Sequence, residues 1–105
     1  MFNGVKASEI IGLDTWENTQ NITNMSYMFY GCKNITNLEP IENWDVSSLT
    51  YTHYMFDGCS NLRSLDLSKW TTGALINTQE MFDGCVLLET LDLRGFNMEN
   101  IEELS

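Results

Sequence analysis

Three cysteines and one histidine are the residues of this chain best suited to act as nucleophile, base or metal ligand. The cysteines are Cys32, Cys59 and Cys85, and the histidine is His53. A thiol–imidazole pair needs both groups in contact and a third group that orients the base, whereas a structural zinc site typically needs a C-x-x-C spacing. The sequence shows neither pattern. It therefore predicts no catalytic residue, no metal ion and no cofactor, with His53 facing solvent.

The cysteines belong to a phrase that recurs along the chain as "MFNGV", "MFYGC", "MFDGC" and "MFDGC". Self-similarity at a period of 20–50 residues is the signature of a repeat fold. One unit alone cannot bury its apolar side, so successive units must stack. We therefore expect a single domain over residues 1–105 whose repeats are residues 1–27, 28–54, 55–80 and 81–105.

Apolar residues recur at equivalent positions of the units, and each such set is called a column below. Three columns are Ile11, Leu38, Leu65 and Leu91; Leu13, Ile41, Leu67 and Leu93; and Trp16, Trp44, Trp70 and Phe96. The stretch "LRSLDLSKW" follows the L-x-x-L-x-L spacing of leucine-rich repeats. The two leucines of "LDL" share one face of a short strand, and the aspartate points to the other face.

These columns predict an α/β solenoid, a right-handed leucine-rich-repeat-like coil of about 26 residues per turn. A short parallel sheet should form one face, with short helical turns opposite. The Met, Phe and Cys of the phrase should point inward, and its glycine should have a positive φ angle. Pro40 interrupts the second unit, so its strand should be irregular.

The columns also favour a structural role for the cysteines and tryptophans. Cysteines at equivalent positions of neighbouring units could approach disulfide distance, but an odd number of them favours small, buried, reduced side chains. The tryptophans could be platforms for sugar rings. Their register with the leucines favours a place in the core.

Two surfaces could bind a partner. The solvent side of the strands should carry Ser64, Thr90, Arg94 and an acidic column of Glu39, Asp66 and Asp92. This face is either a solvated wall or a binding surface for a basic partner or a weakly held cation. On the opposite side, Tyr27 and Tyr54 share a column, where tyrosine is either half-buried packing or part of an interface.

The charge of the chain narrows the classes of partner that it could bind. Fifteen acidic and five basic residues give a formal net charge of −10, which argues against nucleic acid and anionic membranes and favours a basic partner. No apolar run is long enough to insert into a membrane. The first residues lack the features of a signal peptide, so we expect a cytosolic chain or a piece of a longer protein.

The pattern "MFxGCxxLxxLDLSxW", together with "NITNMSYMF", resembles the BspA-like, or DUF285-type, leucine-rich repeats of bacterial and protist surface proteins. The resemblance covers all four units, with Val5 in place of Cys and Phe96 in place of Trp as departures. It implies an extracellular or cell-surface location and a module for adhesion or for binding a protein or host-surface receptor. We expect this module to be non-catalytic and monomeric. The alternatives are a structural spacer in a larger surface protein and a lectin-like glycan binder.

Overall fold

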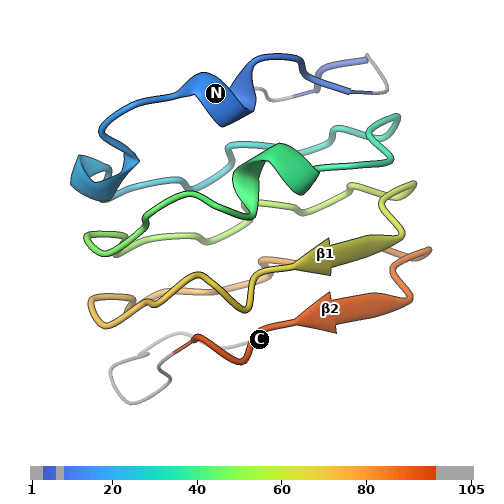
Figure 1. Ribbon diagram of the computed structural model, residues 1–105. Coiled ribbons are helices and arrows are strands. Elements are labelled where there is room, and N and C mark those ends of the chain that lie inside the picture. Colours follow the sequence, from blue (N-terminus) through green and yellow to red (C-terminus); the bar gives the residue numbers. More distant parts are fainter. Residues whose placement is uncertain (1–3, 7–8, 97–105) are drawn as a thin grey trace.

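The computed structural model describes residues 4–6 and 9–96, and it places successive sequence units one below another (Figure 1). The strand side of each unit lies at the front of the view, and the chain returns behind it. The inward positions expected for the Met and Phe of the first phrase fall outside the described residues.

The regular elements are short, and both strands lie on the strand side of the stack. Strands β1 (Ser64–Asp66) and β2 (Thr90–Asp92) pair in parallel, with Leu65 opposite Leu91 and Asp66 opposite Asp92. The first two units carry 3-10 helices at the same level of the repeat, η1 (Leu13–Thr15) and η3 (Glu39–Ile41). A third, η2, spans Thr19–Asn21. Pro40 lies inside η3, which confirms that the second unit has no regular strand there.

The opposite side, called the rear wall below, consists of hydrogen-bonded turns. The backbone N–H groups of Met28 and Cys32 donate to the carbonyls of Met25 and Phe29, three residues earlier in each case. Residues 4–6 and 9–96 contain no α-helix, and hydrogen-bonded turns occupy the side where the sequence predicts short helical turns. The phrase glycines have the expected positive φ, at 71° for Gly31.

Backbone hydrogen bonds connect consecutive units along this rear wall. The N–H of Phe29 donates to Met55 O at 2.9 Å, and the N–H of Phe56 donates to Met81 O at 2.9 Å. Isolated parallel bridges join Asn24 to Tyr51 and Tyr51 to Asn77. The stack is therefore bonded from unit to unit on the rear wall as well as on the strand side.

The inward positions of the phrase and of the strand side form one apolar core. Its fully buried members include Met28, Phe29, Cys32, Met55, Phe56, Cys59, Leu67 and Trp70. The phenylalanines stack on one another, with ring centroids 5.6 Å apart for Phe29–Phe56 and 5.3 Å for Phe56–Phe82. The inward placement of the phrase is thus confirmed in the second and third units. In the fourth unit Phe82 and Cys85 are only partly buried and pack against the core.

The tryptophan column lies in the core and also bonds between units. Trp70 has no exposed surface, and its Nε1 donates to Ile41 O at 3.0 Å. Trp44 is nearly as buried and donates in the same way to Leu13 O at 2.9 Å. The core assignment is confirmed for these two residues, and neither ring is available to stack on a sugar.

Two sequence expectations are corrected. The spacing predicts an inward position for Ile11, yet 88% of its surface is exposed. The adjacent Gly12 has a φ of 98° and the neighbouring Ile10 packs against the core instead, so the turn carries Ile11 outward. His53 was expected to face solvent, but it is half-buried, with Nδ1 3.0 Å from the hydroxyl of Ser26.

Candidate functional site

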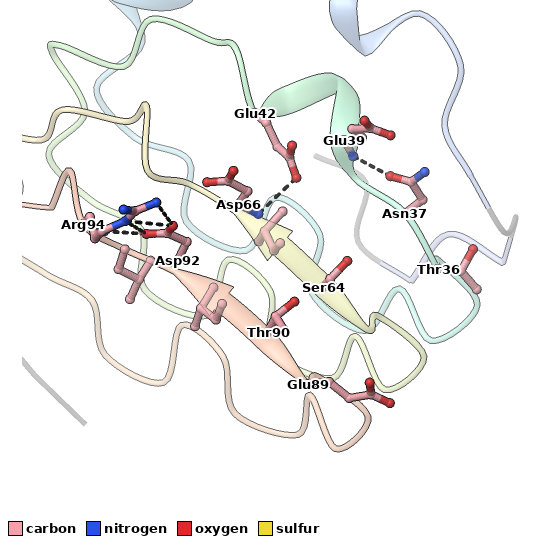
Figure 2. A pocket seen from close by; sticks show the side chains of 13 residues that line it. Thr36, Asn37, Glu39, Glu42, Ser64, Asp66, Glu89, Thr90, Asp92 and Arg94 are labelled. Carbon is pink, nitrogen blue, oxygen red and sulfur yellow. Dashed lines mark hydrogen bonds and ion pairs between the residues drawn. The ribbon is translucent and has the colours of Figure 1, made fainter.

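An open groove of about 1190 Å³ lies on the strand face (Figure 2). Residues from η3, β1, β2 and the segments beside them line it, and all six strand-face residues named from the sequence are among them: Glu39, Ser64, Asp66, Thr90, Asp92 and Arg94. The prediction that these side chains lie together is therefore confirmed. Their joint use in binding stays a prediction.

The acidic column in this groove is not a bare series of like charges. Arg94 binds the carboxylate of Asp92 through Nε at 2.9 and 3.0 Å and through Nη2 at 2.6 Å. These hydrogen bonds and the guanidinium charge hold the pKa of Asp92 below its usual range. Opposite Asp92, Asp66 accepts hydrogen bonds from the hydroxyl and the backbone N–H of Ser68 at 2.6 and 2.9 Å. They likewise lower the pKa of Asp66, although Asp92 opposes the shift.

Glu42 is a member of the groove that the sequence analysis missed. Its Oε2 accepts the backbone N–H of Asp66 at 3.0 Å, reaching from the second unit to the third (Figure 2). A parallel strand in the second unit would offer a backbone carbonyl to β1, but η3 replaces that strand. Glu42 occupies the column of Ser68 and Arg94, and that alignment is the signal that could have found it.

The rear wall carries the second predicted surface, a cluster of exposed aromatic rings. Tyr27 and Tyr54 stack with their centroids 4.9 Å apart and their planes at 15°. Tyr30 lies 5.4 Å from Tyr27 and 6.4 Å from Tyr54. His53 meets Tyr27, Tyr54 and Tyr51 edge-on. Tyr27, Tyr30 and Tyr51 are each exposed, with 41% of Tyr27 accessible. The sequence indicated the Tyr27–Tyr54 pair, and the structure adds Tyr30, Tyr51 and His53.

Three carboxylates continue this wall, and the sequence analysis missed them. Oxygens of Asp57, Glu80 and Asp83 lie within 4.8 Å of one another. Partial burial, and then the charges of Asp83 and Glu80, raise the pKa of Asp57 above its ordinary value. The hydroxyl of Tyr54 hydrogen-bonds to Glu80, which raises the pKa of that tyrosine. The signal was present, because Asp57 and Asp83 are the third residues of the two "MFDGC" phrases.

The cysteines have the surroundings of structural thiols. All three are free, with Cys32 and Cys59 buried and Cys85 partly buried. The thiols of Cys59 and Cys85 donate to Phe29 O and Phe56 O at 3.2 and 3.0 Å. Desolvation raises the pKa of each cysteine, that of Cys85 to about 11. A thiol with a raised pKa is a poor nucleophile at neutral pH.

None of the described helices has the length and apolar character needed to cross a membrane.

Comparison with known proteins places the chain in a family. No curated protein and no solved structure matches the sequence. A family model described as "Mycoplasma protein of unknown function, DUF285" matches residues 1–105, and the chain therefore belongs to the DUF285 family.

Proposed function

We propose that this chain is a non-catalytic protein-binding module, built as a leucine-rich-repeat-like right-handed solenoid, whose strand face binds a basic segment of a protein partner. The groove on that face is the observation that carries the proposal. It is broad, open and lined mainly by carboxylates and hydroxyls, which suits an extended protein surface better than a small apolar ligand.

The charges divide this groove into two parts. Beside β2, Arg94 compensates Asp92, and Arg63 lies 3.4 Å from Glu89. Beside β1 and η3, Glu39, Glu42 and Asp66 face the groove with their negative charge less compensated (Figure 2). A basic side chain of the partner would therefore bind near β1, and the hydroxyls of Ser64 and Thr90 would accept or donate further hydrogen bonds.

The resemblance to BspA-like repeats supports an extracellular or cell-surface location, with a host-surface receptor or another surface protein as the partner. The net charge of −10 is consistent with a basic partner. We propose a monomer as the functional unit.

A structural spacer within a larger surface protein is the second candidate. Hydrogen bonds join consecutive units on the rear wall, and a sheet pairs two of them on the strand side. Such a stack would hold neighbouring domains apart without needing a ligand. The burial of Trp44 and Trp70 gives the lectin-like alternative no comparable support.

The strand-face proposal is tested with a double variant, Glu39→Gln/Asp66→Asn, compared with the parent against a panel of purified surface-receptor ectodomains by biolayer interferometry. We expect at least one receptor to bind the parent and to lose roughly tenfold in affinity, about 1.4 kcal/mol, in the variant. Binding should also weaken as salt rises, because salt screens exposed charges.

A matched control carries the same change of charge away from the groove. Asp14→Asn/Glu17→Gln alters two exposed acids of the first unit that do not line it. It should bind as the parent does. If Glu39→Gln/Asp66→Asn bound the receptor as tightly as the parent does, the strand face would contact solvent and not the partner. Failure of every receptor to bind the parent would favour the spacer.

A further inference from the structure

The rear wall changes its chemistry from one end of the stack to the other. Two columns run along it side by side: Tyr27, Tyr54 and Glu80 in the first, and Tyr30, Asp57 and Asp83 in the second. The wall is therefore aromatic beside the earlier units and acidic beside the later ones. Tyr54 belongs to both parts, since its ring stacks on Tyr27 and its hydroxyl bonds to Glu80.

The aromatic part offers ring faces and edges to a partner. Tyr27 and Tyr30 are exposed while they remain in contact with Tyr54, so the rings are held in place without being covered. Backbone hydrogen bonds fix the residues that carry them, because the N–H groups of Tyr27 and Tyr54 donate to His53 O and Gln79 O. Little side-chain freedom is then lost when a ligand binds.

The acidic part consists of the neighbouring carboxylates of Asp57, Glu80 and Asp83. The ion pairs Arg63–Glu89 and Arg94–Asp92 belong to the strand side. The charges of Asp83 and Glu80 disfavour the ionised form of Asp57, and a cation placed among the three carboxylates would relieve this repulsion.

We propose that the rear wall is a second binding surface, which takes an arginine-bearing segment of a protein partner. A guanidinium group is planar, stacks on aromatic faces and pairs with carboxylates through two parallel hydrogen bonds. Tyrosine rings directly followed by carboxylates offer both contacts to one side chain. The ammonium group of lysine lacks the planar fork and is more strongly hydrated, so the wall should distinguish arginine from lysine.

The test uses a fluorescein-labelled peptide in which arginine alternates with glycine, and the same peptide with lysine, titrated with the whole chain and followed by fluorescence anisotropy. The parent should bind the arginine peptide several-fold more tightly. Tyr30→Ala and Tyr54→Asn should each weaken that binding roughly two- to fivefold. Asparagine suits position 54, because it tolerates the positive φ of 58° found there.

The acidic part is tested with Asp57→Asn/Asp83→Asn, which should weaken binding of the arginine peptide roughly tenfold. Its matched control is Asp14→Asn/Glu17→Gln, which removes the same charge from exposed residues of the first unit outside both surfaces and should leave this binding unchanged. Circular dichroism confirms that each variant is folded. The two proposals are separated by the receptor of the strand-face test, which should lose affinity in Glu39→Gln/Asp66→Asn but not in Asp57→Asn/Asp83→Asn.

Three results would overturn the rear-wall proposal. The first is equal affinity for the arginine and lysine peptides. The second is an equal loss of affinity in Asp57→Asn/Asp83→Asn and in its control variant, which would mean that the overall negative charge alone attracts the peptide. The third is the absence of saturable binding by the parent.

Discussion

Trp70 performs two tasks at once. Its indole fills the core completely, and its Nε1 donates to Ile41 O in the preceding unit. Trp70→Ala should lower the free energy of unfolding by about 3–5 kcal/mol. Trp70→Phe should cost about 1–2 kcal/mol, because phenylalanine occupies this column in the fourth unit and Ile41 O keeps its bond from the N–H of Trp44. Urea unfolding measures both, and an unchanged midpoint for Trp70→Ala would contradict the core assignment.

The thiol of Cys85 should make stability depend on alkaline pH. Burial raises its pKa from 9.0 to about 11. Below pH 9 the thiol is protonated in both states, whereas between pH 9 and 11 only the unfolded chain releases the proton. The free energy of unfolding should therefore fall over this interval, and less so in Cys85→Val, since valine occupies the equivalent position 5.

Urea titrations of parent and Cys85→Val at both ends of that interval measure the difference. A thiol reagent provides an independent check, because the folded protein at neutral pH should react slowly and the unfolded protein should show three thiols without reductant. Fewer than three would reveal a disulfide.

Residue types alone predicted burial well where an apolar column passes through the second and third units. Phe29, Phe56 and Trp70 lie in the core as their spacing required. Ile11 failed because the first unit turns at Gly12, and a one-residue change of direction reverses which neighbour faces inward. The Asp92–Arg94 pair was also missed, because spacing does not show how an exposed side chain folds back on its neighbour.

At the level of elements, the glycines of the repeated phrase lie so close to one another that a Cβ atom on one would contact the backbone of the next. A Cβ atom built on Gly58 would lie 3.4 Å from Gly31 Cα, and the φ of Gly58 is 77°. Gly58→Ala should therefore lower the free energy of unfolding by about 1–2 kcal/mol. Gly73 has ordinary φ and open space around its Cα, so Gly73→Ala is the control and should be neutral or slightly stabilising. Equal thermal midpoints for the two variants would contradict the glycine stack.

The turns of the rear wall show why the columns could not predict every backbone conformation. Tyr27, Tyr54 and Glu80 occupy one column, and all have positive φ, at 61°, 58° and 48°. Side chains of this size seldom adopt that region, so the residue types at these positions did not predict a positive φ. The cross-unit hydrogen bonds of the Tyr27 and Tyr54 N–H groups hold the conformation. These bonds exist only once the units have stacked.

Glu42 stabilises the edge of β1 where the neighbouring strand is missing. Because its carboxylate accepts the N–H of Asp66, Glu42→Ala should lower the free energy of unfolding by about 1 kcal/mol. Glu42→Gln keeps a side-chain oxygen acceptor and should retain most of this stability. Urea unfolding of both variants gives the comparison. An equal loss in the two would mean that the charge, rather than the hydrogen bond, matters.

Across the whole molecule, the strand face and the rear wall shift the pKa values of their acidic residues in opposite directions. On the strand face, Arg94 and Ser68 stabilise the ionised forms of Asp92 and Asp66 and lower their pKa values. On the rear wall, burial and neighbouring acids raise the pKa of Asp57. The surroundings of Asp57 on the rear wall therefore disfavour its ionised form, whereas those of Asp66 and Asp92 on the strand face favour theirs.

This contrast predicts opposite effects for one and the same chemical change. Asp57→Asn should raise the free energy of unfolding at neutral pH, on the order of a few tenths of a kcal/mol, whereas Asp92→Asn should lower it. The stability linked to Asp92 is present at neutral pH and is lost as pH falls through its lowered pKa. For Asp57 the parent becomes more stable as pH falls through the raised pKa, so the advantage of Asp57→Asn should shrink in acid.

Thermal unfolding of the parent and both variants at neutral and mildly acidic pH measures these differences. A shift of the same sign for the two variants at neutral pH would show that net charge, and not the local surroundings of each carboxylate, controls stability.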